Sequence, residues 1–423
     1  MKKHVTIALA LFSFISLVCY GQEKPQLTSS QKVKDFEFLY ETLKDNYPYF
    51  GVGKRTNGID WLSKKEGYIN LVQKTESDSA YIFTLKSILS ELKCGHIHLG
   101  VTQWANEGYR EAYRLMVEES PNSGKDKWLA MFDISPDRTE YWAKILNKKE
   151  VSQSATSKTK IKPVKKNNYS DTIISNGQDR IAIMTIQSFS HLRIKKDKPE
   201  IENFLSNIKG CNTLIINIHD NGGGSEEYWQ NNIVERLIQT PINYLMYPII
   251  KDGEMNRRFY PQYFEKERIL QKGDALQRIP QELLNEKYYI KEERDTITPN
   301  NPVDFQGKIY LLVSEKVFST SEHFAQFCKT TGWATIAGER TGGDGIGSDP
   351  IIVRLPESGI LLCYPALIGV NHDGALNFEE KTIPDILIDG KDANERLSNL
   401  INYIRRAAPL PPKGGSVLPH RGS

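Results

Sequence analysis

The pattern of apolar and polar positions divides the chain into a helical first part and a later part of alternating strands and helices. Over residues 28–93, apolar residues recur three or four positions apart, which is the spacing of amphipathic helices. From residue 180 onward, β-branched runs such as 180–186 and 212–218 alternate with helical stretches. This alternation is typical of crossover connections in a mainly parallel sheet. We therefore expect an α/β fold, preceded by a small helical N-terminal domain.

The same pattern gives the expected domain boundaries. The helical domain covers residues 28–100, and a connecting region with a lysine-rich loop covers 101–178. The core covers 179–395 and contains a long polar and aromatic insertion at 241–300, which suits a lid or subdomain. The proline- and glycine-rich tail at 407–423 is predicted to be disordered.

The N-terminus has the pattern of an export signal. Two lysines precede the apolar run 5–18, and Gly21 offers a small residue for cleavage. The run is short for a membrane span, so we expect residues 1–21 to be a signal peptide and the product to be soluble, in the periplasm or outside the cell. Lipoprotein anchoring through Cys19 is the alternative, although the bulky residue before it fits that processing poorly.

Composition narrows the class of protein. Of the 423 residues, 39% are hydrophobic and 25% are charged, which is ordinary for a globular protein and argues against wholesale disorder. The formal net charge of +3 gives no support for a nucleic-acid partner or a membrane-surface role. The cysteines beyond the signal are scattered, so we expect buried free thiols rather than a disulfide scaffold: Cys94, Cys211, Cys328 and Cys363.

A glycine-rich loop, Asn221 to Gly224, follows an apolar strand and precedes a helix. Consecutive glycines let backbone N–H groups approach a ligand without obstruction, as phosphate binding and oxyanion stabilisation both require. The loop lacks the Gly-Lys-Ser/Thr of a Walker motif and the spacing of a dinucleotide fingerprint. We interpret it as a backbone anion site rather than a simple turn.

The stretch Ser319-Thr320-Ser321-Glu322 has two interpretations. As Ser-x-x-Glu before a helical run, it is a capping box. As a hydroxyl at a helix N-terminus, where the helix dipole favours developing negative charge, Ser319 is a candidate nucleophile. The local sequence supports both interpretations.

The stretch Cys94-Gly95-His96-Ile97-His98 is a third candidate site. In an extended segment its alternate residues share a face, which permits a zinc site of Cys94, His96 and His98. The chain has neither His-Glu-x-x-His nor Cys-x-x-Cys, so a histidine base is the better functional interpretation. A hydrogen-bonded structural histidine is the other alternative.

In this order the motifs resemble those of the tail-specific, or C-terminal processing, serine peptidases, a family that includes the tricorn protease core. The resemblance covers roughly residues 180–390, and CGHIHLG adds an upstream match. It implies a crotonase-like α/β core that hydrolyses peptide bonds through an acyl-enzyme, without a cofactor. The matching segments are IAIMTIQSF, LIINIHDNGGG, VFSTSEHFA, IAGERTGG and FEEKTIPDI.

The resemblance also implies roles for individual residues. Ser319 matches the nucleophile of the family. The backbone N–H groups of Gly223 and Thr320 match its oxyanion hole, with Gly222 as the alternate donor. No cofactor or metal is implied, and no PDZ signature for binding a substrate tail is present.

One branch of the family uses a lysine base, but here Asp344 stands at that position, which argues against a Ser-Lys dyad. The other branch implies His96 as the general base and Glu379 as its orienting carboxylate, with Glu380 as a competitor. His323, one helical turn beyond Ser319, is a rival base, but it is expected to lie along the helix rather than across the cleft.

The favoured hypothesis is an exported serine peptidase that acts on peptides or proteins. The first alternative is an inactive peptidase-like protein that holds a peptide, glycan or small ligand in the same cleft. The second is a zinc hydrolase built on the Cys94 segment. No sequence feature defines an oligomeric state.

Overall fold

The computed structural model describes most of the chain. The expected signal peptide at 1–21, most of the lysine-rich loop and the tail beyond residue 407 lie outside the described residues. The described residues are 26–100, 103–133, 138, 140–142, 144–145, 167–176, 179–264, 268–270, 278–345, 347–371 and 373–407.

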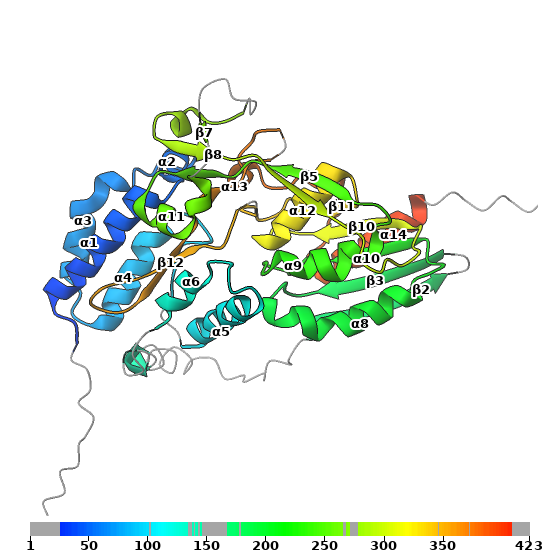
Figure 1. Cartoon of the computed structure of the whole chain (residues 1–423), viewed down its shortest axis with the longest axis horizontal. Coiled ribbons are helices and arrows are strands. Elements are labelled where there is room, and N and C mark those ends of the chain that lie inside the picture. The colour runs from blue at the N-terminus through cyan, green and yellow to red at the C-terminus, as the bar shows by residue number, and fades with distance from the viewer. Residues whose placement is uncertain are drawn as a thin grey trace, which may run out of the picture.

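Helices form the N-terminal part, as the apolar periodicity predicted (Figure 1). The first helix begins with a capping box, because the side chain of Thr28 accepts from the N–H of Gln31 and Gln31 bonds back to Thr28. Its inner face buries Phe36, Leu39 and Leu43. The helices are α1 Ser29–Asn46, α2 Phe50–Asn57, α3 Lys65–Gln73 and α4 Asp78–Ser90.

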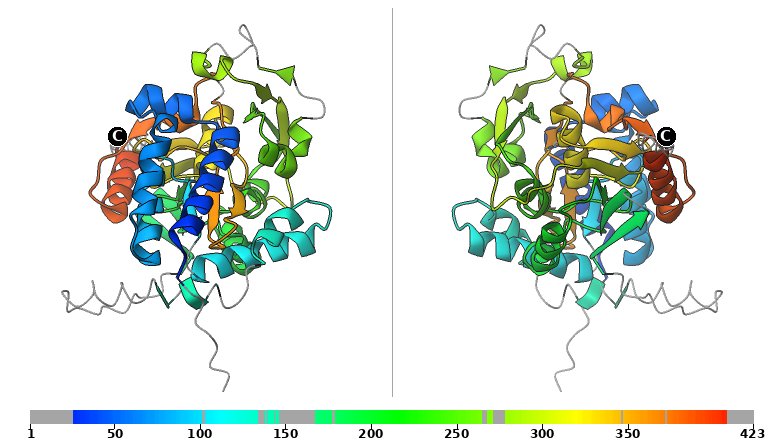
Figure 2. Two further views of the ribbon diagram at one scale, coloured as in Figure 1. Left: turned by 90° about the vertical axis from the view of Figure 1, so that its left-hand side faces the viewer. Right: turned by 90° about the vertical axis from the view of Figure 1, so that its right-hand side faces the viewer.

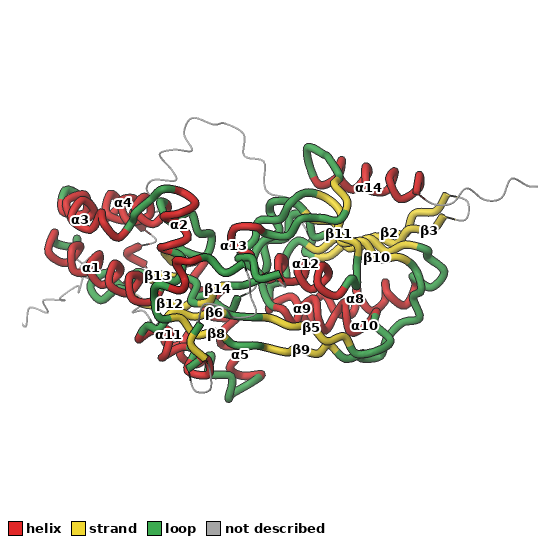
Figure 3. The backbone as a smooth tube through the Cα atoms, turned by 90° about the horizontal axis from the view of Figure 1, so that it is seen from above, coloured by secondary structure: helices red, strands yellow, loops and turns green. Residues whose placement is uncertain are grey.

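A six-stranded sheet, in the order β15-β11-β10-β4-β3-β2, is the centre of the second half (Figure 3). All its neighbouring pairs are parallel except β2 and β3, which confirms the expected α/β fold with a mainly parallel sheet. The sheet starts before the expected boundary at residue 179. Its strands are β2 Tyr169–Asn176, β3 Asp179–Ile186, β4 Thr213–Asn217, β10 Lys308–Val313, β11 Thr335–Gly338 and β15 Ile386–Leu387.

Helices cover both faces of this sheet. Alternate side chains of β4 point to opposite faces, so Leu214 and Ile216 pack in one apolar cluster while Ile215 packs in another. The first cluster contains α8 (Ile194–Asn207), α9 (Glu226–Trp229) and α12 (Thr320–Thr331); the second contains α14 (Ala393–Ala407). Figure 2 shows the red C-terminal helix on the opposite side of the molecule from the insertion.

The insertion at 241–300 forms small sheets of its own. One is the pair β5 and β9; the other joins β6, β7 and β8 to β14 from the later chain. A further sheet, in the order β1-β13-β12, links the segment after α4 to the C-terminal part. These strands are β1 His98–Gly100, β5 Ile242–Met246, β6 Ile249–Lys251, β7 Arg268–Ile269, β8 Tyr288–Ile290, β9 Glu293–Ile297, β12 Ile351–Arg354, β13 Leu361–Tyr364 and β14 Leu367–Ile368.

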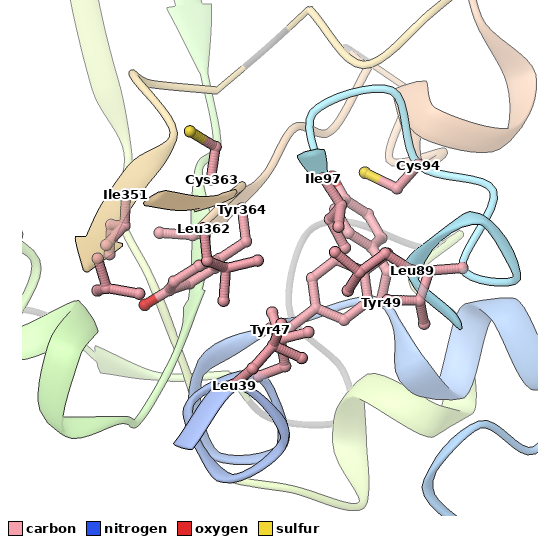
Figure 4. Close-up of a cluster of buried hydrophobic side chains, with 14 of the residues drawn as sticks. Leu39, Tyr47, Tyr49, Leu89, Cys94, Ile97, Ile351, Leu362, Cys363 and Tyr364 are labelled. Atoms are coloured by element: carbon pink, nitrogen blue, oxygen red, sulfur yellow. The ribbon is translucent and has the colours of Figure 1, made fainter. Parts of the chain in front are cut away.

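The N-terminal helices do not have a core of their own. One apolar cluster contains Leu39 and Tyr49 from the helical part, together with Ile250 from the insertion and Leu362 from β13. Figure 4 shows Leu39, Tyr49, Ile351 and Leu362 in this cluster. The helical part, the insertion and residues 351–376 therefore fold against one another.

The remaining elements are short, apart from α5. Within the part of the chain that the structure describes, no helix combines the length and apolar composition needed to cross a membrane. These elements are η1 Leu62–Lys64, α5 Gln103–Glu119, α6 Asp126–Met131, η3 His191–Arg193, η4 Gln230–Val234, α10 Glu235–Leu237, α11 Glu254–Phe259, η5 Pro261–Tyr263, η6 Gln281–Leu284 and α13 Asn377–Glu380.

Candidate active site

Three loops meet at one edge of the central sheet. Strands β4, β10 and β11 are parallel neighbours, so their carboxyl ends lie at the same edge, where α/β proteins commonly bind ligands. The loop after β4 carries the glycines 222–224, the loop after β10 leads to Ser319, and the loop after β11 carries Asp344. Because these three strands are neighbours in the sheet, the three motifs that follow them in the sequence lie close together in space.

Ser319 stands at the N-cap position of α12 but does not act as a cap. No hydrogen bond joins its side chain to the start of the helix, and its Oγ lies 3.0 Å from Nε2 of His96. Its backbone has φ 57° and ψ −131°, outside the helical and extended regions. The hydroxyl is therefore turned across to His96 rather than onto its own helix.

Glu322, the other half of the predicted capping box, does not bond back to Ser319; its side chain is buried against the segment around α13. Its Oε1 accepts hydrogen bonds from Asn377 Nδ2 at 2.8 Å and Thr382 Oγ1 at 2.6 Å. Burial raises the pKa of the carboxyl above its usual value. The motif thus attaches α12 to the segment around α13, and the capping-box interpretation of this stretch is wrong.

His96 lies between a hydroxyl and a carboxylate. Its Nδ1 is 2.7 Å from Oδ2 of Asp344, and its Nε2 faces Ser319. A neutral imidazole that donates from Nδ1 to the carboxylate has a free lone pair on Nε2, which can accept the proton of the hydroxyl. The ring packs against Phe318 at 4.5 Å between centroids, and the side chain is 16% exposed, so part of it remains open to solvent.

The carboxylate beside His96 is Asp344, not Glu379. The carboxylate of Glu379 binds the guanidinium of Arg55, with Nη1 at 3.0 Å from Oε2. Glu380, the expected competitor, binds Arg278. Both glutamates lie on α13 and reach arginines outside the site, so the structure corrects the carboxylate predicted from the family resemblance.

Two backbone hydrogen bonds hold the segment before Asp344 beside Ser319. The N–H of Gly342 donates to the carbonyl of Val317 at 2.7 Å, and the N–H of Ser319 donates to the carbonyl of Gly343 at 3.3 Å. The segment before Asp344 therefore runs beside the segment that ends in Ser319. Asp344 itself has φ 57°, which turns its side chain toward His96.

The glycine loop adjoins Ser319 closely. A Cβ at Gly223, which has φ 112°, would lie 2.9 Å from Cβ of Ser319 and 3.1 Å from N of Thr320, so only glycine fits. The side chain of Thr320 donates to the carbonyl of Gly224 at 2.8 Å, which joins the loop to α12. The loop thus lies where the predicted anion site requires it.

The two predicted oxyanion donors differ in their hydrogen bonding. The N–H of Gly223 donates to Oδ1 of Asn221 at 3.0 Å, whereas no acceptor among the described residues takes the N–H of Thr320. At Gly222, the alternate donor, an added Cβ would meet no atom within 4 Å, so this side of the loop is open. Asn221 also accepts from Oγ of Ser321 at 2.8 Å and thereby holds the loop against α12.

His323, the rival base, faces away from Ser319. Its Nδ1 lies 2.8 Å from Oε1 of Glu226, and its ring packs against Trp229. Burial alone would lower the pKa of His323, but the negative charge and hydrogen bond of Glu226 outweigh that effect and raise it. The residue contributes to the packing behind α12.

The alternative zinc site does not assemble. Asp344 and Ser319 occupy both ring nitrogens of His96, and His98 pairs with Cys363 across the β1–β13 ladder. Burial raises the pKa of the Cys94 thiol, which disfavours a thiolate ligand. As predicted, the cysteines of the described residues are free and buried.

Sequence reasoning missed the roles of Asp344 and Asn221. Asp344 was noticed only as the residue that replaces a lysine. Its position at the end of a parallel strand neighbouring the Ser319 strand was the available signal, since carboxyl ends of neighbouring strands converge. Asn221 had a weaker signal, as the polar residue that begins a glycine loop.

Comparison with known proteins identifies the class of domain to which this site belongs. Residues 180–388 match the model of peptidase family S41. The chain carries an S41 peptidase domain. This confirms the resemblance to the tail-specific peptidases over the matched residues and supports a peptidase activity.

Solved structures share the fold of this chain. One is a putative peptidase from Parabacteroides merdae ATCC 43184, with a TM-score of 0.53 and 19% identity, covering 89% of this chain and 96% of that chain. Another is mature CPAF complexed with lactacystin, with a TM-score of 0.53 and 15% identity, covering 89% of this chain and 97% of that chain. The likeness extends beyond the S41 domain to the helical N-terminal part.

Proposed function

We propose that this S41 chain is an exported serine peptidase, with Ser319 as nucleophile, His96 as general base and Asp344 as the carboxylate that orients the base. The observation that carries the proposal is the continuous hydrogen-bonded line from Ser319 Oγ to His96 Nε2 at 3.0 Å and from His96 Nδ1 to Asp344 Oδ2 at 2.7 Å. These are the contacts that activation of a serine hydroxyl needs.

The reaction follows from this geometry. Oγ of Ser319 attacks the carbonyl carbon of a peptide bond while Nε2 of His96 takes the hydroxyl proton. The C–N bond then breaks, the leaving amine takes that proton from His96, and an acyl-enzyme on Ser319 remains. Water, deprotonated by His96, attacks the ester and restores the hydroxyl. Asp344 stabilises the imidazolium in both halves of the reaction.

The oxyanion of the tetrahedral intermediate would lie between α12 and the glycine loop. The N–H of Thr320, at the N-terminus of α12, has no acceptor among the described residues and is the first donor, and the helix dipole adds to it. Gly223 becomes the second donor when its N–H exchanges Asn221 for the oxyanion, and Gly222 is the alternate. Each such donor lowers the barrier by about 3–4 kcal/mol.

The proposed location and substrate class rest on the sequence and on the family match. The N-terminal signal pattern supports export to the periplasm or the exterior, and S41 membership supports a peptide or protein substrate. Sequencing the N-terminus of the secreted protein tests the export proposal. A mature chain that begins near residue 22 is expected; a product that keeps Met1 contradicts it.

The proposal is tested by covalent labelling of the purified chain with a fluorophosphonate and by digestion of casein. We expect the wild type to be labelled on Ser319, and Ser319→Ala to be neither labelled nor active, with an unchanged circular dichroism spectrum. The control is Ser206→Ala, an exposed serine on α8, which should behave as wild type.

Undiminished labelling or hydrolysis in Ser319→Ala would overturn the assignment. A wild type that resists the probe but retains an intact peptide would instead favour the inactive binding protein.

A further inference from the structure

Asp344 has a second partner besides His96. The hydroxyl of Tyr49 lies 3.3 Å from Oδ1 of Asp344, the carboxylate oxygen that His96 does not use. The same hydroxyl lies 3.3 Å from the carbonyl oxygen of Leu367. A phenol has one proton to donate, and a charged carboxylate is the stronger acceptor of the two. The line of hydrogen bonds from Ser319 through His96 to Asp344 therefore continues to Tyr49.

The surrounding side chains hold Tyr49 in this position. Its side chain is 1% exposed, and its ring stacks on Phe378 at 4.5 Å between centroids, with Tyr47 at 5.7 Å. Figure 4 shows Tyr47 and Tyr49 in the shared apolar cluster beside Leu89. The residue stands just before α2, so the N-terminal part supplies Tyr49 as well as His96.

Apart from His96, the partners of the Asp344 carboxylate are uncharged hydrogen-bond donors. The carboxylate is 8% exposed, and within the described part of the chain its Oδ2 has one partner besides His96, which is Cys94 Sγ at 3.8 Å. Burial, and then the charge of Asp344, raise the pKa values of Tyr49 and Cys94, so both stay protonated at neutral pH. The titratable groups that face the His96–Asp344 pair are Tyr47, Tyr49, Cys94 and His98.

We propose that Tyr49 is a positioning residue that fixes the Asp344 carboxylate against His96 and shares its negative charge through the hydrogen bond to Oδ1. This inference rests on the proposed function of the site. A carboxylate that shares its charge with a phenol attracts a proton on His96 less strongly. The hydroxyl of Tyr49 also holds the carboxylate in the orientation in which Oδ2 meets Nδ1 of His96.

Two variants test this proposal. Tyr49→Phe removes the hydroxyl and keeps the ring between Phe378 and Tyr47. The matched control is Tyr288→Phe, which removes another buried hydroxyl, one that donates to the carbonyl of Pro48 at 2.9 Å. The control disturbs the residue next to Tyr49 without touching Asp344. For each variant, the rate of fluorophosphonate labelling of Ser319 is measured from pH 5 to 9.

We expect the acid limb of this profile to move to higher pH in Tyr49→Phe, with a plateau rate lower by roughly tenfold, while Tyr288→Phe follows the wild type. Replacing Tyr49 by 3-fluorotyrosine, a stronger donor, should move the limb to lower pH. This replacement keeps the hydroxyl and remains informative if Tyr49→Phe does not fold.

NMR titration of the His96 ring in a Ser319→Ala background separates this proposal from the proposed function, because it needs no turnover. We expect the pKa of His96 to rise on Tyr49→Phe. An unchanged titration together with an unchanged labelling profile overturns the role of Tyr49. Activity in Ser319→Ala overturns the proposed function instead, whatever Tyr49 does.

Discussion

Ser319 has a backbone conformation that a non-glycine residue rarely adopts, with φ 57°. Such a conformation costs about 1–3 kcal/mol and persists only where neighbours impose it. Here the N–H of Ser319 donates to Gly343 and its carbonyl accepts from His323, so both sides of the residue are fixed. The strained turn raises the hydroxyl off its helix and presents it to His96.

The identity of the orienting carboxylate gives a prediction at the residue scale. Asp344→Asn should reduce the rate of casein hydrolysis by about 10⁴-fold, because an amide no longer stabilises the imidazolium or selects its tautomer. Glu379→Gln should leave the rate nearly unchanged, since that side chain binds Arg55 instead. Steady-state kinetics of both variants check this. A large loss of rate in Glu379→Gln with little loss in Asp344→Asn would assign the orienting role to Glu379 instead.

Ser319 and His96 were accessible from sequence because each lies within a short motif with few chemical interpretations. Asp344 was not. Its contact with His96 joins residues 248 positions apart and depends on the pairing of Phe318 with Gly343, which no linear pattern reveals. Family resemblance pointed to the glutamates before Pro384, but α13 directs their side chains to arginines.

At the scale of elements, α12 links the site to the rest of the domain through Glu322. Burial raises the pKa of this carboxyl above 4.5, so the folded chain keeps a proton that the unfolded chain releases. The contribution of Glu322 to stability is therefore fully present below pH 4.5 and declines as pH rises toward its folded pKa.

Glu322→Gln removes this ionisation and should gain stability relative to wild type as pH rises from 4 to 7. Urea denaturation at several pH values measures the difference in free energy of unfolding. Glu200→Gln, on the exposed surface of α8, is the control and should show no such trend. Parallel stability profiles for Glu322→Gln and wild type would contradict the prediction.

The alternating elements of the core were predictable because each strand is a short apolar run with a helix after it. The strands of the insertion were not, because β6 and β14 pair across 117 positions, from Ile250 to Leu367, and are only 3 and 2 residues long. Such short strands carry too little periodicity to identify, and tertiary contacts define them.

At the scale of the whole molecule, the shared apolar cluster predicts that the helical part and the S41 domain depend on each other. A chain of residues 167–407 alone would expose Ile351, Leu362 and Tyr364, which are fully buried in the whole protein. Burying each such side chain contributes about 1.5–3 kcal/mol. We expect this fragment to be insoluble or to lack fixed tertiary structure.

Near-UV circular dichroism of the fragment and of the whole chain checks this. The whole chain should lose its near-UV signal and its tryptophan fluorescence in one coincident urea transition. A soluble fragment with a native near-UV spectrum, or two separate transitions in the whole chain, would show that the two parts fold independently.

The candidate site takes His96 from the segment after α4 and Ser319 and Asp344 from loops of the central sheet. During synthesis the base is made first, the nucleophile more than two hundred residues later, and the carboxylate last. Under the proposed function, a chain that is still being synthesised lacks the assembled site and cannot hydrolyse itself or its neighbours. Under the same proposal, peptidase activity would arise only late in folding, when the loop that carries Asp344 reaches His96.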